Sequence, residues 1–401
     1  MSSSRARLRS WTRNPNAVVY ALLLGGALLF PAVSSFATGT NTLVGLVADA
    51  GVWVLLAIGL NVVVGFAGLL DLGYAAFFAI GAYTYALFAS DQLGSSPIHH
   101  SFHMPFWLML FVAMLVAATF GAILGFPTLR LRGDYLAIVT LGFGEIVPRV
   151  FHNMDAWTGG VNAIGGIDPP TLPVCLTGPW SFGNDLAIKT GADCNFSTSD
   201  PTAYYVLMVL LIAGSVILVS NLQKSRLGRA WMAVREDEVA ASAMGVNTVN
   251  IKLLAFAIGA AFSGFGGAFY GAKLSLVSPD NFNFIVSITV LVMVVLGGMG
   301  NIPGVILGSL AIYFIEFKFL IDLPGNAVAV ANAVGLSSLN PSNGDWPGLN
   351  DFVQRLNFLV LGLILVVMML LRPQGILPSR VRAEELRKGV SDQAVSDVAA
   401  T

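Results

Sequence analysis

Residues 225–271 decide the fold of this chain and read SRLGRAWMAVREDEVAASAMGVNTVNIKLLAFAIGAAFSGFGGAFYG. The first half of the stretch is charged and the second half is an uninterrupted apolar run, a pattern typical of an amphipathic helix pair that leads into a membrane span. A short helix is predicted in the first half, ending at Gly245, because glycine best tolerates the left-handed conformation of a helix C-terminus. On that helix, Ala240 and Ala241 leave a shallow face for the groove of a partner protein.

The second half of the stretch carries small residues at every fourth position. This spacing places them along one side of a helix, where they allow a second helix to approach closely. We therefore predict a helix-packing seam formed by Ala255, Gly259, Ser263, Gly267 and Gly271.

The composition of the whole chain is that of an all-α, polytopic membrane protein. Hydrophobic residues make up 56% of the 401 residues and charged residues 11%, against about 25% charged residues in soluble globular proteins. The net charge of -1 says nothing about partners, since the orientation of a membrane protein depends on how its charges are distributed among the loops. The two cysteines, Cys175 and Cys194, lie in one polar insert. This excludes a disulfide scaffold, and whether the two form a disulfide stays open.

Apolar segments that are long enough to cross a bilayer number about ten. The first, 17–37, follows a polar start with four arginines, and a cleaved signal peptide is the alternative interpretation. The segments that begin near Leu69 and Ile302 follow glycine-rich breaks, so one or both are candidates for re-entrant helices. The remaining segments are 42–66, 69–89, 105–126, 134–152, 202–221, 251–273, 284–300, 302–320 and 354–371.

Basic residues alternate between the loops, as the positive-inside rule predicts for a chain with both termini in the cytoplasm. Sixteen of the 21 lysines and arginines fall in segments that this topology places in the cytoplasm. We expect cytoplasmic tails at both ends and a transmembrane domain between them, with one large cytoplasmic loop and two long extracytoplasmic loops. The boundaries are 1–16 and 379–401 for the tails, 17–378 for the transmembrane domain, 222–250 for the cytoplasmic loop, and 153–201 and 321–353 for the extracytoplasmic loops.

Motifs of enzymes and nucleotide-binding proteins are missing from the sequence. The chain lacks the pattern G-x-x-x-x-G-K-[S/T] that holds ATP in Walker-type sites, and it lacks H-E-x-x-H and G-x-S-x-G. His99, His100 and His103 lie together in an outward loop, with no carboxylate beside them in the sequence, and two or more further ligands are needed for a metal. We expect no catalytic residue, no metal site and no nucleic-acid partner.

The segment 133–152, GDYLAIVTLGFGEIVPRVFH, is the most informative of the apolar runs. Glu145 lies near its middle, where an isolated charge costs about 3 kcal/mol, so its carboxylate has to face protein or water. Gly142, Gly144 and a proline weaken the helix around it, and we predict a local break beside a cavity that a polar solute uses. The alternative is a structural ion pair between Glu145 and Arg149, one turn later.

Other polar residues join Glu145 as candidates for a translocation pathway. Thr158, Gly159, Gly160 and Asn162 form a tight polar turn directly outside this span, which either lines an outer vestibule or only reverses the chain. Buried polar candidates lie in the second span and just after it. The complete set is Asn61, Asp71, Thr140, Gly142, Gly144, Glu145, Thr158, Gly159, Gly160 and Asn162.

Short blocks in a fixed order carry a family resemblance over 43–378. They are Gly59–Asn61, Gly65–Tyr74, Leu131–Ala137, Thr140–Ile146, Thr158–Gly160, Leu227–Ala230, Arg235–Glu238, Gly297–Gly300 and Arg372–Gly375. In these blocks the chain resembles the permease subunits of branched-chain amino acid ABC importers, the Liv type. The importer loop has Glu-Ala-Ala, three residues and then Gly. Here Ala240, Ala241 and Gly245 match, while the acid is Glu238, one place early. The inserts around 172–200 and 324–350 depart from the family.

The resemblance implies a permease without catalytic residues or cofactors of its own, in the inner membrane of a bacterium. Its partners would be a second homologous permease, two ATPase subunits that bind ATP and Mg²⁺, an extracytoplasmic amino-acid-binding protein and the lipid bilayer. The family's substrates are usually leucine, isoleucine and valine, with other amino acids, urea and short amides as the alternatives. The resemblance places the ATPase-coupling loop at Arg235, Glu236, Glu238, Ala240, Ala241 and Gly245.

A mechanism follows from this resemblance as a hypothesis. Closure of the ATPases pushes on 234–245, and the helix that carries the Gly259–Gly271 seam transmits the movement to the pathway. One rival is a secondary transporter that uses an ion gradient, with Glu145 or Asp49 as the coupling site. A membrane-embedded enzyme or scaffold is the other rival, and the lack of a clustered nucleophile, base or metal set disfavours it.

Overall fold

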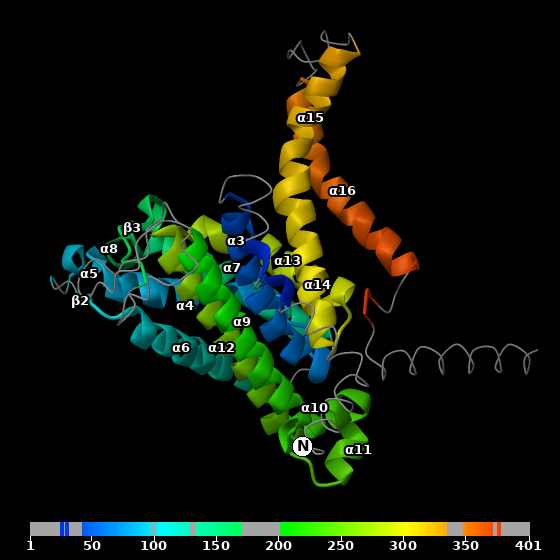
Figure 1. The fold of residues 1–401 in the computed structure, drawn as a ribbon. Coiled ribbons are helices and arrows are strands. Elements are labelled where there is room, and N and C mark those ends of the chain that lie inside the picture. Colours follow the sequence, from blue (N-terminus) through cyan, green and yellow to red (C-terminus); the bar gives the residue numbers. More distant parts are fainter. Residues whose placement is uncertain are drawn as a thin grey trace, which may run out of the picture. The chain divides into compact units, whose positions relative to one another are not determined.

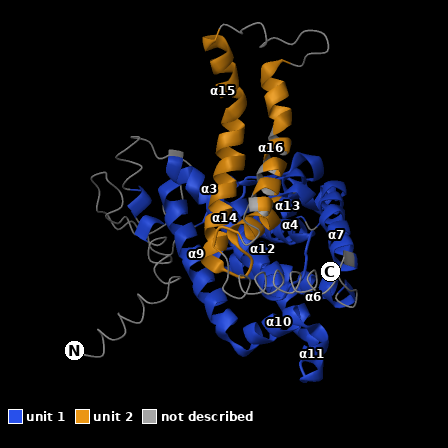
Figure 2. Cartoon of the chain, turned by 90° about the vertical axis from the view of Figure 1, so that its right-hand side faces the viewer, with its two compact units in different colours: residues 1–288 blue, residues 289–401 orange. Residues whose placement is uncertain are grey.

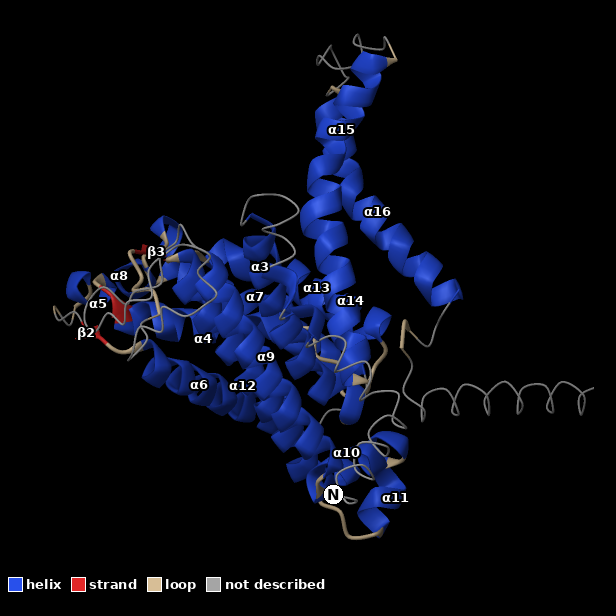
Figure 3. Ribbon diagram, viewed as in Figure 1, coloured by secondary structure: helices blue, strands red, loops and turns tan. Residues whose placement is uncertain are grey.

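The structure is a computed structural model, and it describes residues 25–27, 29–31, 42–97, 99, 102–128, 134–170, 201–334, 348–371 and 375–377 (Figure 1). These residues are mainly α-helical, with a few two-residue strands (Figure 3). The chain divides into two compact units, 1–288 and 289–401 (Figure 2). Both predicted tails and both cysteines lie outside the described residues.

Long helices build the first unit. The helix α3 (Thr42–Leu60) continues into the π-helical turn η1 (Asn61–Phe66), and α4 (Tyr74–Phe88) begins only after the non-helical residues 67–73. The other elements are α5 (Gln92–Ser95), α6 (Phe106–Thr128), α7 (Asp134–Asn153), α8 (Asp155–Thr158), η2 (Gly160–Asn162), α9 (Pro201–Lys224), α10 (Arg226–Glu236), α11 (Glu238–Ala243), α12 (Thr248–Leu274) and η3 (Pro279–Phe282).

The helix α12 is the centre of the first unit and packs against α3, α4 and α6. Its small residues lie at these contacts. A Cβ atom added to Gly267 would overlap the backbone of α4, and one added to Gly259 would overlap Val63 of η1. The Ser263 hydroxyl donates a hydrogen bond of 3.2 Å to the first carbonyl group of α4. A Cβ on Gly271 would lie 3.1 Å from the side chain of Val277. Close helix crossings of this kind require small residues.

The two ends of α12 carry different structures. At its N-terminal end lie α10 and α11, which belong to the predicted cytoplasmic loop (Figure 1). At its C-terminal end, β4 (Leu276–Val277) pairs antiparallel with β3 (Ile164–Gly165). A second antiparallel pair, β1 (Ala89–Ser90) with β2 (Phe102–His103), follows α4.

The second unit begins within α13 (Phe284–Gly297), since its boundary falls after residue 288. One continuous helix follows, formed by α14 (Ile302–Phe314), the π-helical turn η4 (Ile315–Phe319) and α15 (Leu320–Ala333), and then α16 (Leu349–Leu371). A Cβ on Gly297 would overlap the backbone at Gly304, so α13 and α14 cross closely. The helix continues beyond residue 320, where we expected the span to end, and α16 begins before residue 354.

Six helices among the described residues are long and apolar enough to cross a membrane: Leu43–Phe66, Phe106–Thr128, Pro201–Lys224, Thr248–Leu274, Pro279–Gly297 and Ile302–Ala333. Large apolar side chains on them face outward, among them Leu115 (65% exposed) and Leu210 (64% exposed). Water would disfavour such a surface and lipid would not, so the chain is a polytopic membrane protein. At 1.5 Å per residue, the 15 residues of α4 extend only about 22 Å, less than a bilayer core.

Candidate functional site

The predicted cytoplasmic loop 222–250 folds into two helices, α10 and α11, each with its own N-terminal cap. Ser225 caps α10 by accepting a hydrogen bond from the N–H group of Gly228 (3.3 Å). The Asp237 carboxylate caps α11, because it accepts from the N–H groups of Val239 (2.8 Å) and Ala240 (2.9 Å). Gly245 follows α11 with a φ of 85°. The predicted short helix that ends at a glycine is therefore confirmed.

Two side chains anchor this helix pair to the start of α12. The Trp231 ring is fully buried, and its Nε1–H donates to the carbonyl oxygen of Ile251 (2.7 Å). The Lys252 ammonium, on a side chain that is only 12% exposed, forms an ion pair with the Glu238 carboxylate (2.6 Å). These two contacts attach α10 and α11 to the first turn of α12.

The outer surface of α11 is apolar and unusually exposed. Val239 is 72% exposed and Met244 is 85% exposed. Ala240 is also exposed, whereas Ala241 faces inward, and Glu236 lies on the exposed rim. An apolar patch with a polar rim marks a protein interaction surface. We call residues 236–245 the α11 surface.

A third anchor joins α10 to the end of α3. Arg235 donates a hydrogen bond from Nη1 to the carbonyl oxygen of Gly65 in η1 (2.5 Å). The stem of the same side chain packs on Gly68, where an added Cβ would lie 2.7 Å from the Arg235 Cγ atom. Gly68 has a φ of 69°, a conformation that favours glycine. The coupling-loop candidate Arg235 therefore touches the chain where α3 stops being helical.

The non-helical residues 67–73 contain a buried carboxylate. Asp71 is 1% exposed, and its Oδ1 atom accepts a hydrogen bond from the N–H group of Gly73 (2.9 Å). Thr140 of α7 meets this segment, because its Oγ1 accepts from the N–H group of Leu72 (3.0 Å). A cavity of about 10 Å³ lies beside Asp71, Thr140 and Phe143, which is room for one water molecule.

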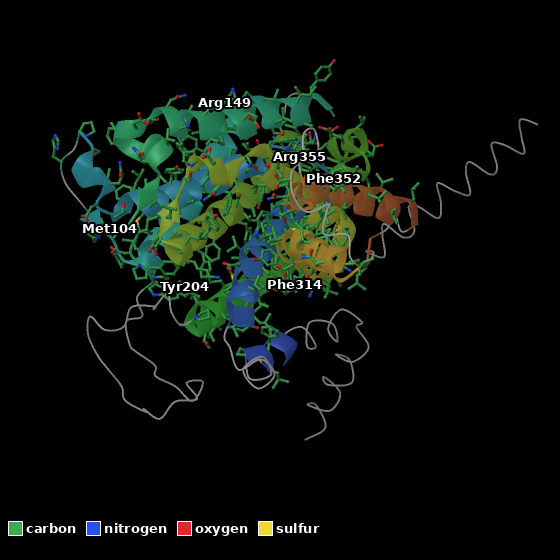
Figure 4. The ribbon with its side chains drawn as sticks, turned by 90° about the horizontal axis from the view of Figure 1, so that it is seen from above. Met104, Arg149, Tyr204, Phe314, Phe352 and Arg355 are labelled. Carbon is green, nitrogen blue, oxygen red and sulfur yellow. The ribbon has the colours of Figure 1, made fainter. Side chains whose placement is uncertain are left out.

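The helix α7 is continuous, so the local break that we predicted beside Glu145 is wrong. The break lies at 67–73 instead, and α7 packs against it: a Cβ on Gly144 would lie 3.2 Å from the Cα atom of Gly73. Glu145 forms an ion pair with Arg149 (3.5 Å), the alternative that the sequence left open. Arg149 projects outward from α7 (Figure 4). Gly142 has open space where a side chain would stand.

The family of the chain follows from a comparison over the residues that form these contacts. A family model described as "Branched-chain amino acid transport system / permease component" matches residues 42–369. The chain belongs to this permease family. No solved structure matches it.

Curated relatives of the permease are themselves transport permeases. The high-affinity branched-chain amino acid transport system permease protein LivM of Escherichia coli K12 is 39% identical over 348 residues, which cover 85% of this chain and 71% of LivM. The corresponding LivH of Salmonella typhimurium is 26% identical over 262 residues, covering 64% of this chain and 78% of LivH. A probable LivM of Methanocaldococcus jannaschii is 24% identical over 362 residues, covering 82% of this chain and 91% of that protein.

The structure divides the ten predicted pathway residues of the permease into separate groups. Asp71, Thr140 and Gly144 come together around residues 67–73, whereas Gly142 and Glu145 lie toward the open side of α7. Asn61 is fully buried as the first residue of η1. The turn beyond α7 is formed by the last group, Thr158, Gly159, Gly160 and Asn162. The Thr158 hydroxyl donates a hydrogen bond to the carbonyl oxygen of Phe151. Both glycines have a positive φ, and Asn162 is exposed.

Sequence reasoning missed the partners that hold these residues in place. Lys252, Trp231 and Gly65 were not among the predicted site residues. Asp49, the coupling residue of the rival secondary transporter, forms an ion pair with Lys273 near the C-terminal end of α12 (2.5 Å). These partners lie far apart in the chain, and no spacing rule connects them.

The end of the first unit opposite α10 and α11 is held by a histidine between two carboxylates. His103 Nδ1 lies 2.5 Å from Asp168 Oδ2, and its Nε2 lies 3.3 Å from Asp91 Oδ1. The hydrogen bond to Asp168, followed by that to Asp91, raises the pKa of His103 above its ordinary value of 6.5. Tyr85 donates from its hydroxyl to the Asp168 carbonyl oxygen (2.6 Å). The cluster pins the β1–β2 hairpin to the segment that follows β3, and among the described residues no group of side chains is suited to a metal ion.

Proposed function

We propose that the chain is the permease subunit of an ATP-binding-cassette importer for branched-chain amino acids, in the inner membrane of a bacterium. Membership of the permease family and the likeness to LivM support the substrate class. The permease would form the translocation pathway with a second, homologous permease. Two ATPase subunits would bind ATP and Mg²⁺, and an extracytoplasmic binding protein would deliver the amino acid.

The α11 surface is the observation that carries this proposal. An isolated helix of six residues is unstable in water, yet α11 is capped by Asp237 and fixed to α12 through the Glu238–Lys252 ion pair. The exposed apolar side chains of the α11 surface, Val239 on the helix and Met244 just after it, then have no role inside the first unit. A firmly anchored, outward-facing apolar helix is what a groove in an ATPase needs in order to push on the permease.

The open side of α7 supports a pathway shared with the second permease. Its exposed residues include Tyr135 (69%) and Ile138 (64%), but also the Glu145–Arg149 ion pair. A charged pair on a helix of this length is costly against lipid, so protein or water has to cover it. A zwitterionic amino acid offers an ammonium group to Glu145 and a carboxylate to Arg149, while its apolar side chain contacts Ile138 or its neighbours.

Reconstitution tests the proposed function directly. The permease, its homologous partner and the two ATPases are assembled in proteoliposomes with the binding protein, and uptake of labelled leucine is compared with uptake of labelled urea. We expect ATP-dependent leucine uptake. Uptake by the permease alone under a proton or sodium gradient would instead support the ion-coupled rival, and preference for urea would reassign the substrate.

A second test determines on which side of the membrane α10 and α11 lie. Single cysteines at Met244 and Asn162, in a chain with Cys175 and Cys194 replaced by serine, are treated with a membrane-impermeant maleimide in intact cells. We expect labelling at Asn162 only, and labelling of both positions after the cells are opened. Labelling of Met244→Cys in intact cells would contradict the coupling role of the α11 surface.

A further inference from the structure

We propose that Arg235 is a positioning residue that transmits the movement of α10 and α11 to residues 67–73, and through them to α7. This inference rests on the proposed function and names the route of coupling within it. In the earlier hypothesis the movement passes along the small residues of α12. Here the segment that moves is the non-helical stretch between α3 and α4. We call residues 67–73 the linker segment.

The linker segment is attached to α10 through Arg235. The guanidinium group bonds to the Gly65 carbonyl oxygen at the end of η1, and the stem of the side chain packs on Gly68. The N–H groups of Ala67 (3.3 Å) and Leu69 (3.1 Å) still bond back to carbonyl oxygens within η1. The chain is therefore continuous in its hydrogen bonding from η1 to Leu69, and a pull on Gly65 reaches the linker segment.

The other end of the linker segment is attached to α7. The N–H group of Leu72 bonds to Thr140, and Gly73 lies so close to the Thr140 carbonyl group that a Cβ would overlap it. The Asp71 carboxylate bonds to the N–H group of Gly73 and stiffens the turn between the two attachments. Thr140 and Glu145 lie on the same helix, less than two turns apart. Displacement of the linker segment therefore moves the helix whose open side carries the ion pair.

The helix α12 is the less suitable transmitter because its neighbours enclose it. Its glycines contact the backbones of α4 and α6 so closely that sliding would create overlaps. Trp231 and Lys252 attach α10 and α11 to this helix only at its first turn. In this arrangement α12 is the support on which the helix pair tilts, and Arg235 is the contact that carries the tilt away from it.

The first test replaces the guanidinium group and measures leucine taken up per ATP hydrolysed in proteoliposomes of the complete complex. Arg235→Met keeps the apolar stem but loses the donor, and we expect the ratio to fall by about tenfold, the factor that corresponds to one charge-assisted hydrogen bond. Arg235→Lys keeps a charged donor, and we expect it to retain part of the coupling. Arg229→Met is the matched control, since Arg229 is exposed and bonds only one turn back, to the Lys224 carbonyl oxygen. An unchanged ratio in Arg235→Met would overturn the inference.

The second test restores the lost contact with a covalent bond. A Cβ on Gly68 would lie 3.3 Å from the Arg235 Cβ atom, near the separation of about 3.8 Å in disulfides. In the serine background for Cys175 and Cys194, we make Gly68→Cys with Arg235→Cys. We expect the reduced form to hydrolyse ATP with little uptake, and the oxidised form to regain uptake per ATP, because the disulfide replaces the side-chain contact.

The outcomes separate this inference from the proposed function. If the unmodified complex takes up leucine with ATP, but the oxidised double variant stays as uncoupled as the reduced one, the Arg235 route is wrong and the importer remains. Because a cysteine is strained at the positive φ of Gly68, failure to form the disulfide leaves the decision to the Arg235→Met ratio, which overturns the inference if it is unchanged. If the unmodified complex shows no ATP-dependent uptake of any amino acid, the proposed function itself fails.

Discussion

The Glu238–Lys252 ion pair permits the most quantitative prediction. Replacement of Glu238 by glutamine leaves the Lys252 ammonium in a site where its side chain is 12% exposed. Breaking a fully buried ion pair costs about 3–5 kcal/mol, but the Glu238 side chain is 44% exposed, so water offsets part of this loss. We expect α11 to be about 1–2 kcal/mol less firmly docked on α12, which raises its undocked population about 5–30-fold.

Hydrogen exchange of residues 238–246 in the assembled permease measures this docking, and leucine uptake per ATP measures its effect. We expect Glu238→Gln to increase exchange by about this factor, because exchange follows the undocked population, and to lower the uptake ratio as the docked fraction falls. Lys252→Met should be milder, because it removes the buried charge and leaves the half-exposed Glu238 in water. The double variant should behave like Lys252→Met, since the cost lies in the unpaired ammonium group.

Glu236→Gln is the control, as Glu236 is exposed on the same surface and carries the same charge. If Glu238→Gln and Glu236→Gln give the same exchange and the same uptake ratio, the ion pair does not hold α11 in its coupling position. The reasoning from burial would then be refuted.

Three further predictions concern glycines and the opposite end of the first unit. Gly245→Val should uncouple ATP hydrolysis from uptake more strongly than Gly245→Asn, because the φ of 85° penalises a β-branched residue although the surrounding space is open; equal uptake per ATP in the two variants would contradict this. Gly81→Val should sharply reduce the folded permease recovered from membranes, since a Cβ there overlaps the backbone of α12 at Gly264, whereas Gly142→Val meets nothing and should be recovered normally. The hydrogen bonds that raise the pKa of His103 stabilise the fold fully below its ordinary pKa of 6.5, and this stabilisation is lost as the pH rises through the raised pKa. Hydrogen exchange in the β1–β2 hairpin should therefore increase more steeply at high pH than elsewhere. His103→Gln should remove this extra increase.

Local structure in the permease was predictable where the sequence carries a local signal. Among the described residues, six of the about ten predicted spans are helices long and apolar enough to cross a membrane, and the other four are not confirmed as spans. The helix α11 follows from the alanines and the glycine at its end. The small residues of α12 indicated close packing through their spacing, because a repeat of four keeps them on one side of the helix. None of these signals identifies which neighbouring helix is contacted.

Contacts between distant parts of the chain were not predictable from the sequence. The Arg235–Gly65 hydrogen bond joins residues 170 positions apart, and a backbone carbonyl group leaves no mark in the sequence. We placed the helix break in α7 because of its glycines and proline, but α7 stays continuous and the break occurs at 67–73. Likewise, we predicted that the span ends at residue 320 and a loop begins at 321, whereas the helix continues and Lys318 and Asp322 form an ion pair one turn apart within it (2.8 Å).

The position of Trp231 beneath α12 has a consequence for biogenesis. Its hydrogen-bond partner, the Ile251 carbonyl group, and the partner of Glu238, Lys252, are both synthesised after α10 and α11. The helix pair therefore reaches its docked position only after the start of α12 has been synthesised, whereas Gly65, the partner of Arg235, is made much earlier. We expect nascent chains that end before residue 251 to lack the docked helix pair, so that the α11 surface takes up its position only after the start of α12 has been made.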